Sequence, residues 1–442
     1  MIEYGREEMV EIRAFKATIL NPELETRAEL VCPVYDTIDA QQYEQYAADR
    51  NNAIHFSTRK EGVAEGDFVD YAKLSLERFF ADGILKVRDQ PAFYIYGIRY
   101  SLSGGIVEQI PEEERREIYF AFGLVALVKV DKLNEHSIEG HEKTFETKTR
   151  ERSHLMKACG MNFSPIVAEY SMPGHDINNI FEAYLGFRRP DLKLDEQRKP
   201  VMDVVINDAR HLLWEVTDED VIDKIQKLMR EKRIMILDGH HRYTAAYQVS
   251  KDQEEGTAYT MMMLVEGGDR ALLLLPWHRC VRQCRMGELW ARITDYFTVE
   301  SYDKPTGEAR IYSRLNESTD EFDVRFGMYD GEKYYVLRAD KGRIRKLAEA
   351  RGERVGLDVI SLHEWLIEPT LIGEPEDVVF TASPREAIEK VDKEAYNVAF
   401  FLRRLRIANV EYKAHVEKKV FPQKSTLFLP KVAEGIVMWK WK

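Results

Sequence analysis

The chain has 442 residues, 44% of them hydrophobic, which predicts a folded globular protein with two domains. A formal net charge of −12 and an isoelectric point near 5.6 argue against a surface that coats nucleic acid, but they are compatible with a local basic pocket. Four cysteines are too few for a disulfide-dense scaffold, and the charged start lacks the apolar stretch of a signal peptide. We therefore expect a cytoplasmic protein without transmembrane segments.

In chain order, the first expected elements are strands and one long helix. Residues 10–20 have the apolar character of a strand, and a proline in "ELVCPVYDTI" should hold the chain extended before Asp36. Residues 67–85 carry apolar side chains at three- and four-residue spacings, which predicts an amphipathic helix ending near Gly83. Two apolar runs follow and predict an antiparallel pair of strands, at 91–102 and 119–130.

The second half of the chain continues with mixed helices and strands. Residues 216–232 predict a helix capped by Thr217 or Asp218, and this helix leads into a strand at 234–237. The apolar runs at 260–265 and 271–277 are too short to span a membrane and predict buried strands. A second α+β region is indicated by strands at 322–329 and 333–339 and helices at 359–371 and 383–391.

The stretch "IMILDGHHRYTAAY" concentrates titratable side chains where a buried strand runs into a helix. The strand ends at Asp238, Gly239 permits a tight turn, and the free N–H groups of the helix N-terminus attract anions. Arg242 could grip a phosphate through two hydrogen bonds, while His240 or His241 could donate hydrogen bonds or move protons. Asp238 could hold magnesium or act as a base. The alternative is a structural turn with Asp238 as the helix cap.

Two further clusters combine a histidine with charged residues. In "IEGHEKT", a base, an acid and a cation could converge on a loop through His141, Glu142 and Lys143, although a solvated loop is equally expected. In "LLLLPWHRC", His278 and Arg279 follow the end of an apolar strand. Both clusters are candidates for phosphate contacts.

Two other patterns are ambiguous. In "FPQKSTLFLPK", Lys424, Ser425 and Thr426 resemble the end of a phosphate loop, but the glycine pair of a Walker loop is missing. A strand with alternating polar and apolar faces explains the segment equally well. Cys280 and Cys284 lie near a histidine, but they are too few to hold zinc and are expected to be ordinary thiols.

Together, "VCPVYDTI", "HEKT", "ILDGHHRYTAAY", "LPWHR" and "FPQKSTLFLPK" resemble, in this order, the family of domain of unknown function 1015, over nearly the whole chain. The DGHHRY stretch also resembles the phosphate-contacting box of the ParB and sulfiredoxin-like superfamily, which includes partition proteins, sulfiredoxins and kinases of free serine. The resemblance implies that Arg242 contacts nucleotide phosphates and that His240 and His241 line the same pocket. Two positions depart from the family pattern. Val34 stands between Pro33 and Tyr35, where the family usually has a double proline before Tyr-Asp, and Lys143 replaces a more frequent arginine.

The resemblance implies an α+β fold, with a ParB/sulfiredoxin-like core of mixed sheet and helices, a large insertion and an additional C-terminal α+β region. The phosphate-binding domain is expected over residues 10–290, with the insertion around 90–200. A C-terminal domain is expected over 291–442, and it would contribute the FPQKST segment to the site.

Our leading hypothesis is an enzyme that uses ATP or ADP to phosphorylate a small metabolite, such as free serine or a similar amino acid. Positive charge on the phosphates would come from Arg242, Arg279, Lys424 and Lys143. Asp238 would hold magnesium, and Asp36 or His241 would take the acceptor proton.

Other functions remain open on the sequence alone. The same pocket would serve a phosphatase acting on a small phosphorylated metabolite, or a nucleotide-gated regulatory protein without turnover. The expected partners are a nucleotide and a small molecule, while no membrane or nucleic acid partner is expected. A homodimer is compatible with the sequence.

Overall fold

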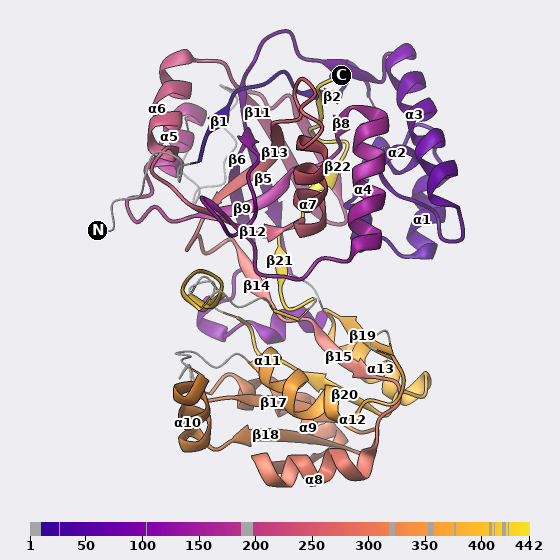
Figure 1. The fold of residues 1–442 in the computed structure, drawn as a ribbon, viewed down its shortest axis with the longest axis vertical. Coiled ribbons are helices and arrows are strands. Elements are labelled where there is room, and N and C mark those ends of the chain that lie inside the picture. The colour runs from indigo at the N-terminus through magenta and orange to yellow at the C-terminus, as the bar shows by residue number, and fades with distance from the viewer. Residues whose placement is uncertain are drawn as a thin grey trace.

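A computed structural model shows two α+β parts stacked along the long axis of the molecule (Figure 1). The described residues are 10–25, 27–102, 104–186, 198–317, 323–351, 358–374, 377–405, 409–410, 412–417, 421–422 and 424–442. Gln423, in the FPQKST segment, and part of the insertion expected around 90–200 lie outside these residues. The expected α+β class is confirmed.

Among the described residues, nine strands form the large sheet of the first part. The strands are β1 (Ile12–Arg13), β5 (Phe93–Tyr100), β6 (Tyr119–Lys129), β7 (Ile138–Glu139), β9 (Ile166–Tyr170), β10 (Met202–Ile206), β11 (Ala209–Val216), β12 (Ile234–Asp238) and β13 (Tyr259–Glu266). Their order is β10-β11-β5-β6-β13-β9-β12-β7, with β1 beside β6. The sheet is mixed, because β9 runs parallel to β13 and antiparallel to β12. The expected antiparallel pair is confirmed in β5 and β6.

Helices cover both faces of this sheet (Figure 1). They are α1 (Ala40–Ala47), α2 (Ile54–Ser57), α3 (Glu65–Ala81), α4 (Glu146–Cys159), α5 (Asp176–Leu185), α6 (Glu219–Met229) and α7 (His240–Ser250). Along β5, Tyr94 and Tyr96 face the core under α3 and α4, whereas Phe93 and Ile95 face the core under α5 and α6. A strand buried on both faces needs apolar residues at every position, which explains the continuous apolar runs.

Helix ends follow the expected local chemistry. Asp218 caps α6 by accepting hydrogen bonds from the backbone of Asp220 and Val221. The long helix α3 ends at Ala81, and Gly83 behind it has the left-handed φ of 68° that glycine adopts easily. Residues 10–20 differ from the expected single strand, because they split into β1 and β2, which pair with different partners.

The second part is built on a six-stranded antiparallel sheet of described residues, in the order β16-β18-β17-β20-β15-β19. The strands are β15 (His278–Val281), β16 (Phe297–Asp303), β17 (Arg325–Tyr329), β18 (Lys333–Ala339), β19 (Val378–Thr381) and β20 (Val398–Phe401). The helical segments are α8 (Met286–Tyr296), α9 (Lys304–Leu315), α10 (Lys341–Arg351), α11 (Asp358–Leu362), η7 (His363–Ile367), α12 (Glu368–Thr370), α13 (Pro384–Lys393) and η9 (Tyr412–Val416).

The last residues of the chain, 421–442, return from the second part and pack on the first (Figure 1). We call this segment the tail. Its strands β21 (Leu427–Leu429), β22 (Ala433–Glu434) and β23 (Trp439–Lys440) pair with β14 (Leu273–Leu275), β3 (Cys32–Pro33) and β8 (Met161–Asn162). The tail therefore brings distant residues to the first part.

The remaining elements are short. They are β2 (Thr18–Leu20), β4 (Leu85–Val87) and the short 3-10 helices η2 (Arg27–Leu30), η3 (Tyr35–Thr37), η4 (Gly104–Gln109) and η5 (Glu112–Glu114). None of the helices in the described part of the chain combines the length and apolarity needed to cross a membrane.

Candidate functional site

The turn between β12 and α7 has the geometry of an anion-binding helix start. Gly239 joins the two elements with a φ of 94°, and a Cβ atom there would come within 2.9 Å of the Nε and Nη2 atoms of Arg242. Both the left-handed backbone and this close contact require glycine. Among the described residues no side chain caps helix α7 where it starts at His240, so the N–H groups of its first turn remain available to a ligand.

The Arg242 side chain turns inward rather than toward solvent. Its Nη1 donates to Ser164 Oγ (2.9 Å) and to the Pro165 carbonyl (2.7 Å), and its Nη2 donates to Asp238 Oδ2 (2.8 Å). The other oxygen of Asp238 accepts a hydrogen bond from Lys431 of the tail. Although burial opposes it, the positive charges of Lys431 and Arg242 lower the pKa of Asp238 to about 2, so this carboxylate is ionised at neutral pH.

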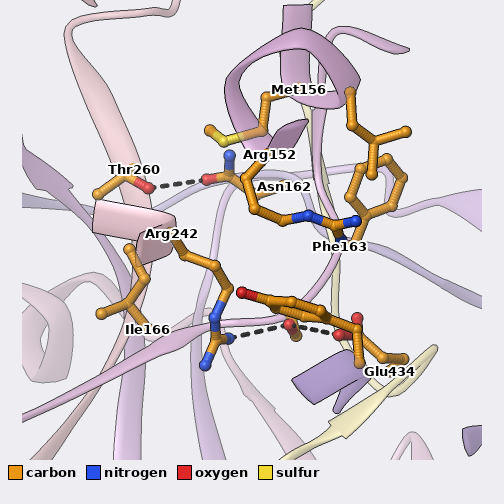
Figure 2. A pocket seen from close by; sticks show the side chains of 11 residues that line it. Arg152, Met156, Asn162, Phe163, Ile166, Arg242, Thr260 and Glu434 are labelled. Carbon is orange, nitrogen blue, oxygen red and sulfur yellow. Dashed lines mark hydrogen bonds between the residues drawn. The ribbon is translucent and has the colours of Figure 1, made fainter. Parts of the chain in front are cut away.

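Ser164 connects this ion pair to a second acidic residue, Glu434, which belongs to the tail. Figure 2 shows Arg242 and Glu434 on either side of this connection. Its hydroxyl donates to Glu434 Oε1 at 3.0 Å. Glu434 is buried, and burial raises the pKa of its carboxyl group. A continuous chain of contacts therefore runs from Lys431 through Asp238, Arg242 and Ser164 to Glu434, within reach of the helix start.

Further charges surround the same turn. Lys148 of α4 and Lys424 of the tail both act electrostatically on His241, and exposed Asp36 acts on it with the opposite sign. The cations that meet here are Arg242, Lys431, Lys148 and Lys424. They face the carboxylates of Asp238 and Asp36, and Glu434 also acts on Arg242, so four cations of the described residues gather at one turn of a protein of net charge −12. Such a cluster attracts anions.

The histidines of the site are neutral at physiological pH. Burial lowers the pKa of His240 to about 4 and that of His141 to about 3, and the two rings meet edge to face at 4.7 Å. Burial and the charge of Lys148 lower the pKa of His241 to about 4. Its Nε2 accepts a hydrogen bond from the backbone N–H of Phe145 at 2.9 Å, so the ring proton is on Nδ1.

The HEKT and FPQKST segments, 283 residues apart, meet beside the histidine pair. One carboxylate oxygen of Glu142 accepts hydrogen bonds from Ser425 N, Thr426 N and Thr426 Oγ1, each at 3.1 Å. His141 Nε2 lies 3.1 Å from Thr426 Oγ1. Lys424 has a left-handed φ of 50°, and its ammonium lies 4.9 Å from the centre of the Trp277 ring. The N–H groups of Ser425 and Thr426 thus bind a carboxylate of the protein itself.

The other expected residues lie apart from the turn. His278 belongs to β15 in the second sheet, where its ring nitrogens lie 3.0 Å from the Tyr312 hydroxyl and 3.3 Å from the Leu402 N–H. Arg279 is fully buried and donates to His363 Nε2 at 3.2 Å and to the Trp277 carbonyl. Lys143 is exposed on the loop between β7 and α4.

Sequence reasoning missed several residues of the site, namely Lys148, Ser164, Lys431 and Glu434. Lys148 follows the HEKT segment by four residues, so its place in the first turns of α4 offered a weak signal. The two tail residues gave none, because Lys431 meets a carboxylate 193 residues earlier in the chain.

Several solved structures are similar to this chain, at low sequence identity and low TM-score. A free serine kinase in complex with AMP is 12% identical with a TM-score of 0.31, and the alignment covers 68% of this chain and 93% of the kinase. SbnI with a C-terminal truncation, from Staphylococcus aureus, is 13% identical with a TM-score of 0.34, covering 70% and 85%. A conserved hypothetical protein from Pyrococcus furiosus is 11% identical with a TM-score of 0.31, covering 66% and 87%.

At such low similarity, function has to be argued from the residues of the site. Among curated proteins, none matches this sequence. One family model does match, over residues 12–360, which is well over half of the chain. The chain therefore belongs to the family described as protein of unknown function (DUF1015).

Proposed function

We propose that this chain is a nucleotide-dependent phosphotransferase, which binds the phosphates of ATP or ADP at the N-terminus of α7 and phosphorylates a small metabolite. The observation that carries the proposal is the cluster of four cations beside the start of α7, which no side chain of the described residues caps. Phosphoryl transfer requires mainly positioning and stabilisation of charge on the phosphate oxygens. Backbone N–H groups and nearby ammonium groups supply both.

In this proposal the lysines bind the phosphates directly. Arg242 does not contact the phosphates, but binds Asp238, which in turn binds Lys431. Three of the N–H groups of Arg242 are already used by Ser164, Pro165 and Asp238. The phosphate oxygens are therefore bound by the N–H groups of the first turn and by Lys431, Lys424 and Lys148. His241 donates from Nδ1, since its Nε2 is already an acceptor.

Asp36 is the proposed general base. It is exposed on η3, and its negative charge acts on His241 across the cationic turn. Its carboxylate takes the proton of the acceptor hydroxyl, whose oxygen then attacks the terminal phosphorus. The bond between this phosphorus and the bridging oxygen breaks, and the nucleotide leaves with one phosphate fewer. Free serine or a similar amino acid is the acceptor to test first, following the sequence resemblance.

A magnesium ion does not fit at Asp238 in this arrangement. Both carboxylate oxygens bind cations, Arg242 and Lys431, and the charge of Lys424 also acts on the group. Magnesium prefers oxygen ligands that carry uncompensated negative charge. The proposal therefore uses the lysines, rather than a metal held by Asp238, to balance the phosphate charge.

Phosphorus NMR with ATP or ADP and a panel of small hydroxyl compounds, including serine, tests this function. We expect a new phosphate ester from the wild type, and nucleotide affinity about tenfold weaker or more in Lys431→Ala, because a charge-assisted hydrogen bond is lost. Lys333→Ala, which removes an exposed lysine of β18, is the matched control. Phosphate release from phosphoserine without nucleotide would instead indicate a phosphatase, and nucleotide binding without turnover a gated binding protein.

Asp36→Asn separates chemistry from binding. If Asp36 is the base, kcat falls about a hundredfold or more while nucleotide affinity stays unchanged or rises, because a negative charge near the phosphates is removed. An unchanged kcat would exclude Asp36 as the base.

A further inference from the structure

Five side chains form a closed ring that ties the tail to the start of α7. Lys431 binds Asp238, Asp238 binds Arg242, Arg242 binds Ser164, and Ser164 binds Glu434. The backbone of the tail closes the ring, because Lys431 and Glu434 are separated only by Val432 and Ala433. A change at one member is therefore transmitted to the others.

The hydrogen-bond directions in the ring are fixed by Ser164. Its hydroxyl has one proton, which it donates to Glu434, so the oxygen presents a lone pair to Arg242 Nη1. The adjacent Pro165 carbonyl accepts the second Nη1 proton at 2.7 Å. The loop before β9 thus holds one edge of the guanidinium, and Asp238 holds the Nη2 atom.

Packing alone does not hold the guanidinium, because a cavity of about 30 Å³ lies beside it (Figure 2). The cavity is lined by Arg152, Arg242, Ser164, Glu434 and apolar side chains that include Phe163 and Ile166. This space is large enough for a water molecule. Among the described residues, the Nε atoms of Arg152 and Arg242 have no hydrogen-bond partner. With Ser164 removed, Arg242 has room to move away from Asp238.

We propose that Ser164 and Glu434 are positioning residues of the phosphate site: they hold Arg242 against Asp238, and Asp238 in turn holds Lys431 at the start of α7. This inference rests on the proposed function, because it assigns a ligand-binding role to Lys431. Glu434 lies on the tail, beyond residues 12–360 that the family model matches. The tail is in this view part of the site rather than a terminal extension of the second part.

Calorimetric titration with pyrophosphate, which has no nucleoside or acceptor, tests the binding consequence. Ser164→Ala removes the link between Arg242 and Glu434, and we expect affinity to fall about tenfold, as for other supporting residues of a ligand site. Ser164→Thr keeps the hydroxyl, with the adjacent cavity to take its methyl group, and is expected to restore affinity to within about twofold. Ser75→Ala, at a buried serine of α3, is the control for a general loss of packing.

Glu434→Gln separates the hydrogen bond from the charge. The amide oxygen can still accept from Ser164, so the ring is retained and pyrophosphate affinity is expected to stay within about threefold of the wild type. Glu434→Ala removes the acceptor and is expected to match Ser164→Ala. Equal affinities in Ser164→Ala, Ser75→Ala and the wild type would overturn the proposal.

A second readout requires no ligand. The ¹⁵N–¹H signal of the Arg242 Nε group, assigned by its absence in Arg242→Lys, is expected to shift or broaden in Ser164→Ala but not in Ser75→Ala. An unchanged signal in Ser164→Ala would show that Ser164 does not position Arg242. A wild type that binds neither pyrophosphate nor nucleotide would instead overturn the proposed function, so the two failures are distinguishable.

Discussion

The turn after β12 and the turn after β14 each carry histidine and arginine behind a buried strand, but different elements follow them. After β12 the chain enters α7, whose first N–H groups are capped by no side chain in the described part of the chain. After β14 it enters β15, whose backbone is hydrogen-bonded in the ladders with β19 and β20. The first turn therefore has donors left for a ligand, whereas in the second they are used within the sheet.

The arginines of the two turns have equally different surroundings. Arg242 has the carboxylate of Asp238 beside it, with Lys431 on the other side of that carboxylate. Arg279 donates to His363 Nε2 and to the Trp277 carbonyl, and burial lowers its pKa to about 9 against the opposing charge of Glu142. The comparison teaches that histidine and arginine after a strand can lie in two different environments. In the proposed function, the free N–H groups and the charges around them bind the phosphates.

The largest expected difference between the turns concerns Asp238. Asp238→Ala leaves Arg242 and Lys431 without their shared counter-charge, and we expect a loss of about 3–5 kcal/mol in the free energy of unfolding, measured in urea. Asp36→Ala, at an exposed carboxylate, is the control and is expected to change stability by less than about 0.5 kcal/mol. A loss below about 1 kcal/mol for Asp238→Ala would contradict the buried ring.

Acid is expected to destabilise both turns. The pKa is about 4 for His240 and about 3 for His278 in the folded protein, both below that of an unfolded histidine near 6.5. The unfolded state therefore takes up protons first, so stability is lost as pH falls from about 6.5 toward 4, by about 2 kcal/mol per histidine at pH 5. His240→Gln and His278→Gln should each make the fall between pH 7 and pH 5 shallower. A slope equal to that of the wild type would contradict the buried, neutral state of the replaced histidine.

Alanine substitutions at two glycines with similar φ values test the close contact between Gly239 and Arg242. Gly239 and Gly268 have φ values of 94° and 84°, so the left-handed conformation lowers the free energy of unfolding by about 1 kcal/mol in both alanine variants. Only at Gly239 does the added Cβ meet Arg242, whereas Gly268 has no atom within 4 Å. We expect Gly239→Ala to cost about 1–2 kcal/mol more and to weaken pyrophosphate binding. Equal losses of stability in the two variants would contradict the close contact.

The smallest expected effect is on ligand binding at the second turn. His278→Gln changes a side chain whose hydrogen bonds lie within the second sheet, so pyrophosphate affinity should stay within about twofold of the wild type. A fall as large as that of Lys431→Ala would show that the two turns share one ligand.

Local chemistry made much of the first part predictable from sequence. The β12 strand, the glycine turn and the start of α7 follow from apolar periodicity and the behaviour of glycine, and the Asp218 cap follows from the side chain of aspartate. What followed β14 was not predictable, because β15 is defined by pairing with strands about 100 residues later in the chain. Local pattern does not determine long-range pairing.

The site itself was predicted only in part. Gly239 and the two histidines of the candidate site lie within one short stretch that the sequence singles out, but the inward direction of Arg242 depends on Ser164, 78 residues earlier. The role of the FPQKST segment was likewise hidden, because its N–H groups bind Glu142 across 284 residues. A single sequence carries no signal for pairs this far apart.

The most direct test of the central claim is a residue-resolved NMR titration of the wild type with pyrophosphate, following the backbone amides of both turns. If the anion binds at the start of α7, the amide signals of His240, His241 and Arg242 shift most, together with that of Lys431, while those of His278 and Arg279 stay in place. Largest shifts at β15, or none at α7, would contradict the account.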